Sequence, residues 1–285
     1  MRPTQVALLR CPRCGGGLEY VGTTDGGELH MGNLRCAQPC DQAWPVEDGV
    51  PRLLAATPGW GLEGFVYWIY QVLAPIHDLG VKYGLPLAML ASEDDVRGGL
   101  LPQLELEALA AEPRDGRPVR ILDVGIGGGG NLPWLAWAVP PGLDVELWGI
   151  DYSSQMLAQC RRRLLAWKGP RVELLLGDAH ALPFADASFD RVLHVGAIAS
   201  YRDPGRALAE MTRVARPGTP VVVVDEQLAA GADWYRYVMF HWITMFDHVK
   251  RAPIEHVPPG VTDVRLTQPT AFYYCLSFRT PGTAA

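Results

Sequence analysis

Residues 118–285 alternate runs typical of strands with runs typical of helices. The strand-like runs are VRILDVG, VELWGID, RVELLLGD, FDRVLHVG and PVVVVDE, and three helix-like runs stand between them, NLPWLAWAV, SSQMLAQCRRRLLAW and DPGRALAEMTRVA. Parallel strands need long crossovers, so this alternation predicts a doubly wound α/β sheet. Two further runs, VTDVRLTQ and AFYYCLSFR, are joined by a short turn. They predict an antiparallel C-terminal hairpin that brings the sheet to seven strands.

Two shorter zones precede this region. Residues 1–55 are rich in Gly and Cys, and residues 56–117 hold the aromatic stretch FVYWIYQVLAP and a predicted helix at 100–112. We therefore divide the chain into a small N-terminal unit (1–55), a helical linker or cover (56–117) and a main domain (118–285). The sequence shows no secretory signal and no run of about 18 apolar residues that could span a membrane. These features predict a cytoplasmic protein.

A glycine-rich turn follows the first strand of the main domain. The run is Asp123-Val-Gly125-Ile-Gly127-Gly-Gly129-Gly130, and it opens a helix. Glycines at such a turn let the backbone approach a ligand closely. The spacing fits the dinucleotide pattern G-x-G-x-x-G, so NAD is one candidate ligand. Asp123 argues against NAD, because a carboxylate so near the glycines suits a ligand ammonium group better than a pyrophosphate.

Acidic residues also end the next two strands. Asp151 closes the second strand, where a carboxylate can accept hydrogen bonds from both hydroxyls of a ribose. Both cofactor classes use such an acid, so Asp151 alone does not separate them. The third strand ends in Gly177-Asp178-Ala179, and Leu-Pro-Phe follows at 182–184.

Together these motifs resemble the class I S-adenosylmethionine-dependent methyltransferases. The order is D-x-G-x-G, a strand-end Asp, then GDA-x-x-LPF before FDRV, and ALAEMTRVARPG precedes the fifth strand. The branch that it resembles most contains the ubiquinone and menaquinone C-methyltransferases. The resemblance covers residues 118–228 and, loosely, the hairpin. It implies a Rossmann-like fold and S-adenosylmethionine as the cofactor.

The resemblance also implies roles for individual residues. Gly125, Gly127 and Gly129 match the loop that faces the methionyl part of the cofactor, and Asp123 the acid near its amine. The remaining matches are Asp151 for the ribose, Tyr152 and Met156 beside the adenine, Asp178 for the adenine amino group and Ala179 for a ring nitrogen. The chain departs from the branch at Ile126, where Cys or Ala is usual, and at Gly128 and Gly130. These changes remove no ligand.

Methyl transfer from a sulfonium has a neutral leaving group, so positioning supplies most of the acceleration. A general base is needed only when the acceptor must lose a proton. Four residues are candidates because they lie on segments expected at the carboxyl edge of the sheet, where ligands bind. They are His194, Tyr201, Glu226 and His241.

Four cysteines form a second motif. Cys11 and Cys14 make one close pair, Cys36 and Cys40 another, and 21 residues separate the pairs. Two such knuckles suit a tetrahedral zinc ion, and filling all four positions with protein makes the metal structural. A C-x-x-x-C second knuckle departs from the usual spacing. This run resembles the small zinc ribbon fused ahead of some methyltransferases, and also the free-standing partner of tRNA and release-factor methyltransferases. Cys160 and Cys275 are expected to be buried thiols.

The acceptor is expected to be a small, largely hydrophobic metabolite. Two aromatic-rich segments, 65–73 and 234–246, flank the core and can cover an apolar pocket. The net charge is −6, and residues 1–55 hold five Arg, no Lys and six acids, which makes a poor phosphate-binding surface. An rRNA or tRNA base methyltransferase stays open as an alternative, with Arg161, Arg162 and Arg163 as a local basic run. A further alternative is a non-catalytic cofactor-binding protein whose ribbon recruits a partner.

Overall fold

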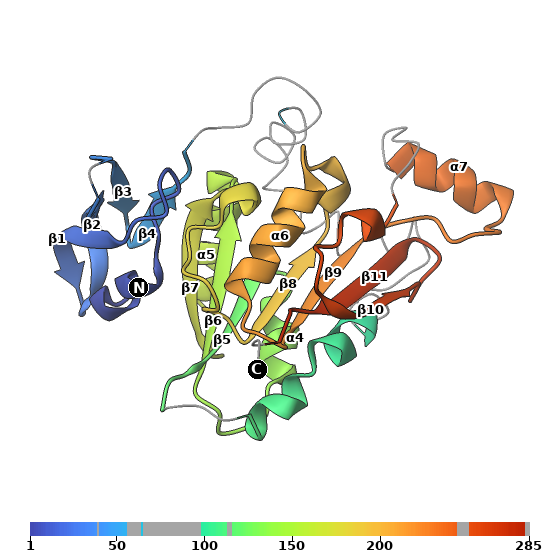
Figure 1. Cartoon of the computed structure of the whole chain (residues 1–285), viewed down its shortest axis with the longest axis horizontal. Helices are drawn as coiled ribbons and strands as arrows, with labels where there is room; N and C mark the ends of the chain where they lie inside the picture. The colour runs from blue at the N-terminus through green and yellow to red at the C-terminus, as the bar shows by residue number, and fades with distance from the viewer. Residues whose placement is uncertain (39, 56–63, 65–97, 113–115, 244–250, 283–285) are drawn as a thin grey trace.

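The protein is built on one continuous sheet of 11 strands (Figure 1). The computed structural model describes residues 1–38, 40–55, 64, 98–112, 116–243 and 251–282. The N-terminal unit comprises the 3-10 helix η1 (Pro3–Leu8) and strands β1 (Leu18–Asp25), β2 (Glu28–Cys36), β3 (Ala43–Glu47) and β4 (Val50–Leu53). The main domain contains strands β5 (Val119–Val124), β6 (Val145–Asp151), β7 (Arg171–Gly177), β8 (Arg191–Val195), β9 (Pro220–Glu226), β10 (Thr262–Thr267) and β11 (Tyr273–Arg279).

The predicted doubly wound α/β fold is confirmed. Seven strands lie in the order β7-β6-β5-β8-β9-β11-β10, with the first five parallel and the hairpin of β10 and β11 antiparallel. All residues of β9 except Glu226 are buried, and four of them are consecutive valines. Burial on both faces is typical of a central strand covered by helices.

The predicted number of strands was too small. Strand β4 of the N-terminal unit pairs in parallel with β7, so β1 to β4 extend the seven strands to eleven. In the seven strands of the main domain alone, β7 would be an open edge, and an open edge offers unpaired backbone groups to any strand that reaches it. Residues 1–55 supply that strand from within the same chain.

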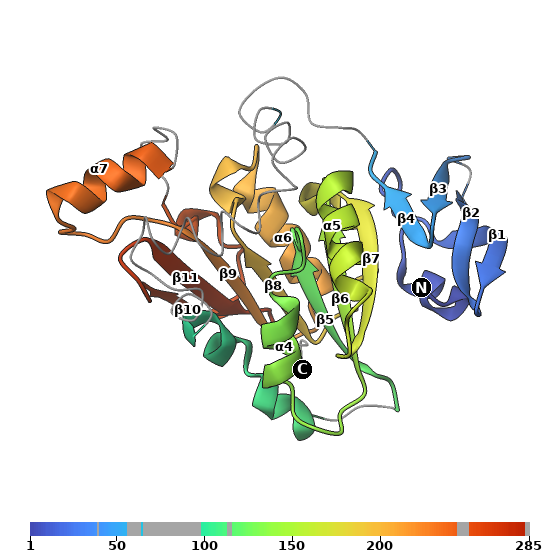
Figure 2. The same cartoon turned by 180° about the vertical axis from the view of Figure 1, so that it is seen from behind.

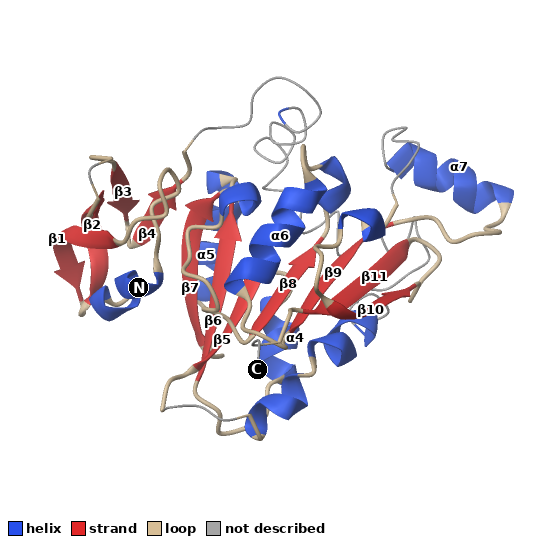
Figure 3. Cartoon of the chain, in the orientation of Figure 1, coloured by secondary structure: helices blue, strands red, loops and turns tan. Residues whose placement is uncertain are grey.

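Helices cover both faces of the sheet (Figure 2, Figure 3). α4 (Leu132–Ala138) and α5 (Ser154–Leu164) pack on one face, and α6 (Pro204–Val214) packs on the other. The N-cap side chain of Ser153 accepts a hydrogen bond from the amide of Met156, and Asp203 caps α6 through the amide of Arg206. α7 (Trp234–Ile243) projects from the body beyond β9 and β11 (Figure 1).

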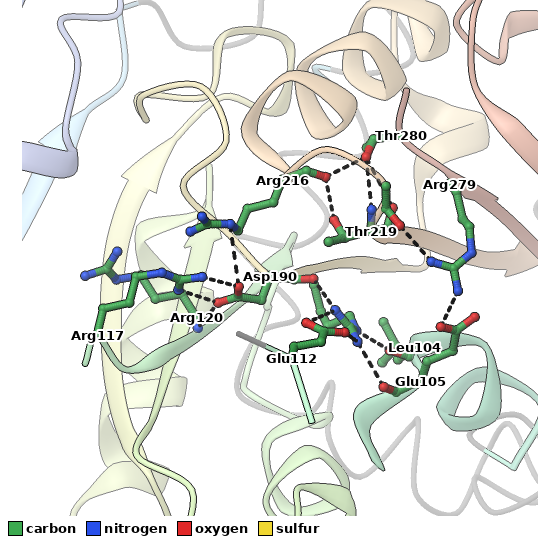
Figure 4. Close-up of polar contacts among 12 residues, drawn as sticks. Leu104, Glu105, Glu112, Arg117, Arg120, Asp190, Arg216, Thr219, Arg279 and Thr280 are labelled. Atoms are coloured by element: carbon green, nitrogen blue, oxygen red, sulfur yellow. Dashed lines mark hydrogen bonds and ion pairs between the residues drawn. The ribbon is translucent and has the colours of Figure 1, made fainter. Parts of the chain in front are cut away.

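The predicted helix at 100–112 is replaced by two short 3-10 helices, η3 (Leu101–Leu104) and η4 (Leu106–Ala110). Between them Glu105 adopts a left-handed conformation with φ 48°. Figure 4 labels the three residues on this side of the contact, Leu104, Glu105 and Glu112. The fully buried guanidinium of Arg191, the first residue of β8, donates to the carbonyls of Leu104 (2.6 Å) and Glu105 (3.0 Å) and pairs with Glu112. A continuous α-helix would engage those carbonyls itself.

Residues 113–115 and most of 56–97 lie outside the described residues, so the division at 55 and 117 stays a prediction. Among the described helices, none is both long enough and apolar enough to cross a bilayer.

Candidate functional site

The glycine-rich turn joins β5 to α4 at the carboxyl edge of the parallel strands. Gly125, Gly127 and Gly129 have φ values of 72°, 55° and 79°. A Cβ atom at Gly125 would lie 3.3 Å from the ring of His194, and one at Gly129 would lie 2.8 Å from Sγ of Cys160. A larger residue at these positions would be strained by the left-handed backbone, and its Cβ would press against neighbouring side chains. Glycine is therefore required in this turn.

Asp151 ties this turn to the start of α5. Its carboxylate accepts hydrogen bonds from the amides of Gly127 and Ser153, each at 2.8 Å. Burial raises the pKa of Asp151 to about 6 although these amides favour the charged form. A carboxylate has about four acceptor positions, so two remain for the hydroxyls of a sugar.

The other predicted cofactor residues gather around the same turn. The buried carboxylate of Asp123 accepts a hydrogen bond from Asn131 at 3.0 Å. The methyl group of Met156 would lie 3.2 Å from a Cβ at Gly127, and half-buried Tyr152 directly follows Asp151. Asp123, Tyr152 and Met156 thus lie at the carboxyl ends of β5 and β6 and in the first turn of α5.

Asp178 follows β7, and its carboxylate already has three donors. One oxygen accepts from the amide of His180 at 2.9 Å and from Nδ1 of His180 at 2.6 Å, and the other accepts from Arg202 at 2.6 Å. Although burial opposes ionisation, these bonds hold the pKa of Asp178 well below its usual range. Only about one acceptor position is left for an adenine amino group. The next residue, Ala179, opens the 3-10 helix η5 (Ala179–Ala181).

Two of the four candidate catalytic residues lie beside the glycine turn. The rings of His194 and Tyr201 are 5.3 Å apart, and the Tyr201 hydroxyl would lie 3.6 Å from a Cβ at Gly125. His194 donates from Nδ1 to the carbonyl of Val124 at 2.7 Å, so its proton sits on Nδ1 and Nε2 keeps a lone pair. Burial lowers the pKa of His194 to about 4 and, with the charge of Asp151, raises that of Tyr201 well above 10. At neutral pH both side chains are therefore uncharged.

The other two candidates are placed differently. Glu226 ends β9 and is half-buried. The side chain of His241 on α7, like segment 65–73 and residues 244–246, lies outside what the structure describes. Within the described part of 234–246, Phe240 is buried and stacks on Phe272, whereas Trp234 is 79% exposed and Tyr237 is 55% exposed. Trp234 and Tyr237 thus enclose no pocket in this structure.

Three polar residues at this edge were missed from the sequence. His180 and Arg202 hold Asp178, and the ring of His180 lies 5.2 Å from that of Tyr201. Asp225 is fully buried near the end of β9 and accepts from the amides of Ala197 (3.0 Å) and Ala199 (2.9 Å) in the loop after β8. Asp151 was predicted because it is an acid at the end of an apolar strand. Asp225 follows the same pattern, so the sequence could have predicted it too.

The four cysteines of the N-terminal unit converge. Their Sγ atoms all lie within 4.8 Å of one another, with separations of 3.3 Å for Cys14–Cys40, 3.5 Å for Cys14–Cys36 and 3.8 Å for Cys11–Cys40. A tetrahedral zinc with bonds of about 2.3 Å separates its sulfur ligands by roughly 3.8 Å. The donor set and its spacing therefore fit a structural zinc ion. Cys160 and Cys275 are buried in α5 and β11, as predicted.

Comparisons with known proteins agree with this geometry. Residues 121–218 match the family model described as methyltransferase domain. The chain is 36% identical over 155 residues to the demethylmenaquinone methyltransferase of Renibacterium salmoninarum, covering 54% of this chain and 58% of that protein. It is 40% identical over 137 residues to an uncharacterised 37.1 kDa protein in transposon Tn4556 of Streptomyces fradiae. That match covers 48% of this chain and 37% of the transposon protein. The chain spans about half the length, or less, of these relatives.

A solved structure supports the fold over a longer stretch. The phosphoethanolamine N-methyltransferase 2 of Haemonchus contortus, in complex with S-adenosyl-L-methionine, aligns with 92% of this chain and 71% of its own. The TM-score is 0.53 at 16% identity. The family match, the strand order and the glycine turn with its strand-end acids lead to one conclusion: residues 121–218 carry a methyltransferase domain.

Proposed function

We propose that the protein transfers the methyl group of S-adenosylmethionine to a small, largely hydrophobic acceptor. The observation that carries the cofactor assignment is the bond between Asp151 and the amide of Gly127, which unites the strand-end acid and the glycine turn in one site. When bound, S-adenosylmethionine would supply an electrophilic sulfonium methyl group. Gly125, Gly127, Gly129 and Asp123 would face its methionyl part, and Asp151, Tyr152, Met156, Asp178 and Ala179 its nucleoside.

The residues beside the glycine turn favour catalysis by positioning. His194 is an unprotonated imidazole with a pKa of about 4, which makes it a weak base. Tyr201 keeps its proton and can donate a hydrogen bond but not remove a proton. Holding two reactants in line can lower a barrier by roughly 7–11 kcal/mol. An acceptor that loses no proton in the transfer then needs no base.

The cofactor assignment predicts selective binding. S-adenosylmethionine and S-adenosylhomocysteine are expected to bind the purified protein, and NAD is not, because the buried carboxylate of Asp123, two residues before the glycine turn, would repel a pyrophosphate bound at that turn. Isothermal titration calorimetry measures all three. Binding of NAD without any response to S-adenosylhomocysteine would contradict the proposal.

The hydrophobic acceptor is supported by the relative named demethylmenaquinone methyltransferase and by the aromatic content of residues 65–73. With S-adenosylmethionine carrying a labelled methyl group, we expect label in the organic-soluble fraction of a cell extract and none in ribosomal RNA. RNA labelling that is lost when Arg161, Arg162 and Arg163 are changed to Ala, but kept when they are changed to Lys, would favour the RNA alternative.

We also propose that Cys11, Cys14, Cys36 and Cys40 bind one structural zinc ion and that the protein acts in the cytoplasm. The zinc proposal rests on the sulfur separations of 3.3 to 3.8 Å, which a tetrahedral ion accounts for.

A further inference from the structure

The N-terminal unit contacts the main domain next to the candidate adenine-binding residues. We call residues 176–185 the adenine segment, because they contain Asp178 and Ala179. Two separate pieces of the N-terminal unit bind the two ends of this segment, one through β4 and one through residues 8–10.

The first contact is the parallel pairing of β4 with β7. Arg52 pairs with Leu176 and Leu53 pairs with Gly177. Leu53 is fully buried, and its carbonyl oxygen would lie 3.6 Å from a Cβ on Gly177. Gly177 directly precedes Asp178, so β4 fixes the backbone from which the Asp178 side chain projects.

The second contact is a short antiparallel bridge. The amide of Arg10 donates to the carbonyl of Pro183 at 2.9 Å, and the amide of Ala185 donates to the carbonyl of Leu8 at 2.8 Å. Between them Leu9 lies opposite Phe184, and both side chains are fully buried. This bridge fixes the chain where it leaves η5.

The second contact is continuous with the metal centre. Cys11 follows Arg10 directly, and its Sγ lies 3.8 Å from that of Cys40. Two further bonds close the knuckle, from the amide of Cys11 to the carbonyl of Gly16 and from the amide of Gly15 to the carbonyl of Cys11, each at 2.8 Å. A metal bound to Cys11, Cys14, Cys36 and Cys40 would therefore hold the backbone of residues 8–10 in the position that pairs with Pro183 and Ala185.

A third contact comes from the main domain itself. Glu210 on α6 accepts from the amide of Leu182 at 2.8 Å, and Arg213 donates to the carbonyls of Leu182 (2.9 Å) and Phe184 (2.7 Å). These bonds do not involve the N-terminal unit. Loss of the metal would thus loosen the adenine segment without releasing it fully.

We propose that the N-terminal unit positions the adenine segment, so that metal occupancy of the four-cysteine site sets the affinity for the adenosyl cofactor. This inference rests on the proposed function for the identity of the ligand. The metal acts at a distance, through Leu8, Leu9 and Arg10, and takes no part in the transfer step.

The test compares zinc-loaded, chelator-stripped and zinc-restored protein. Protein prepared without chelator is expected to contain about one zinc per chain. Stripping should weaken the binding of S-adenosylhomocysteine by about tenfold, a usual size for coupling between two sites. Hydrogen exchange at residues 176–185 should rise while β8 and β9 stay protected, and zinc should restore both. Calorimetry and hydrogen-exchange mass spectrometry supply the two readouts.

Matched variants separate metal loss from a change of surface. Cys14→Ser should behave like stripped protein, and Cys14→His should retain zinc and affinity. Arg13→Ser, at the neighbouring exposed position, should match the wild type.

Two results would overturn the inference. The first is that zinc-free protein, with zinc loss proven by metal analysis, binds S-adenosylhomocysteine within twofold of the zinc-loaded protein and shows unchanged exchange at 176–185. Loss of protection in β8 and β9 as well would also overturn it, because the coupling would then be global. If no form binds S-adenosylhomocysteine, the proposed function fails, and the exchange at 176–185 still decides the coupling.

Discussion

Replacement of Arg191 by Ala is expected to lower the free energy of unfolding by about 3 kcal/mol, because buried carbonyl groups that lose their donor cost about 1–3 kcal/mol each. The guanidinium is 1% exposed and pairs with Glu112. It also donates to the carbonyls of Leu104 at 2.6 Å and Asp190 at 2.7 Å. Without Arg191 these carbonyls would lose a buried donor. Urea unfolding measures the change.

A control and a second readout sharpen this prediction. Arg162→Ala, at an exposed position on α5, should change the free energy of unfolding by less than about 0.5 kcal/mol. Arg191 begins β8 and therefore lies at the opposite edge of the sheet from the glycine turn. Folded Arg191→Ala protein should accordingly bind S-adenosylhomocysteine like the wild type. If Arg191→Ala lowered the free energy of unfolding by less than about 1 kcal/mol, the carbonyls of Leu104 and Asp190 would have found other donors, and the prediction would be wrong.

Replacement of Asp151 by Ala is expected to weaken S-adenosylhomocysteine binding by about 1–3 kcal/mol. Two sources of affinity are lost. The carboxylate would accept hydrogen bonds from the ribose, and it also holds the amide of Gly127 at 2.8 Å. Isothermal titration calorimetry measures the difference, and Asp144→Ala, an exposed acid just before β6, is the control. Equal affinity in both variants would remove Asp151 from the cofactor site.

Asp151 also predicts how cofactor binding depends on pH. Burial raises its pKa to about 6, so the carboxyl is ionised at pH 7.5 and protonated at pH 5. Ribose hydroxyls need the ionised acceptor. The affinity of the wild type should therefore fall as the pH drops through 6, whereas that of Asp151→Asn should stay flat. His194, with a pKa of about 4, and Asp178, with a lower one, titrate below this window. The same slope in Asp151→Asn would assign the titration to another group.

The sequence predicted those features that local signals specify. Strand and helix periods identified β5 to β9 and the hairpin, and the structure places Asp151 at the end of β6 and Asp178 just after β7, as the strand periods predicted. The spacing of the cysteines predicted a cluster, and the Sγ atoms do lie within 4.8 Å of one another.

The features that the sequence did not predict depend on distant partners. The break at Glu105 follows from Arg191, which is 86 residues away in the chain. The pairing of β4 with β7 joins residues more than a hundred positions apart, and neither strand shows a pattern that selects the other. Arg202, which lies in a different loop, donates a hydrogen bond to Asp178. The carboxylate that the resemblance assigned to adenine therefore has most of its acceptor positions filled by the protein itself.

The pairing of β4 with β7 has a further consequence because both strands belong to one polypeptide. A partner that covered the same edge as a separate chain would dissociate on dilution. Because β4 is part of the same chain, its pairing with β7 is intramolecular. The effective concentration of a tethered segment is of order 1 mM. The edge of β7 should hence stay covered at any enzyme concentration used in an assay. Cofactor affinity should be the same at nanomolar and micromolar protein.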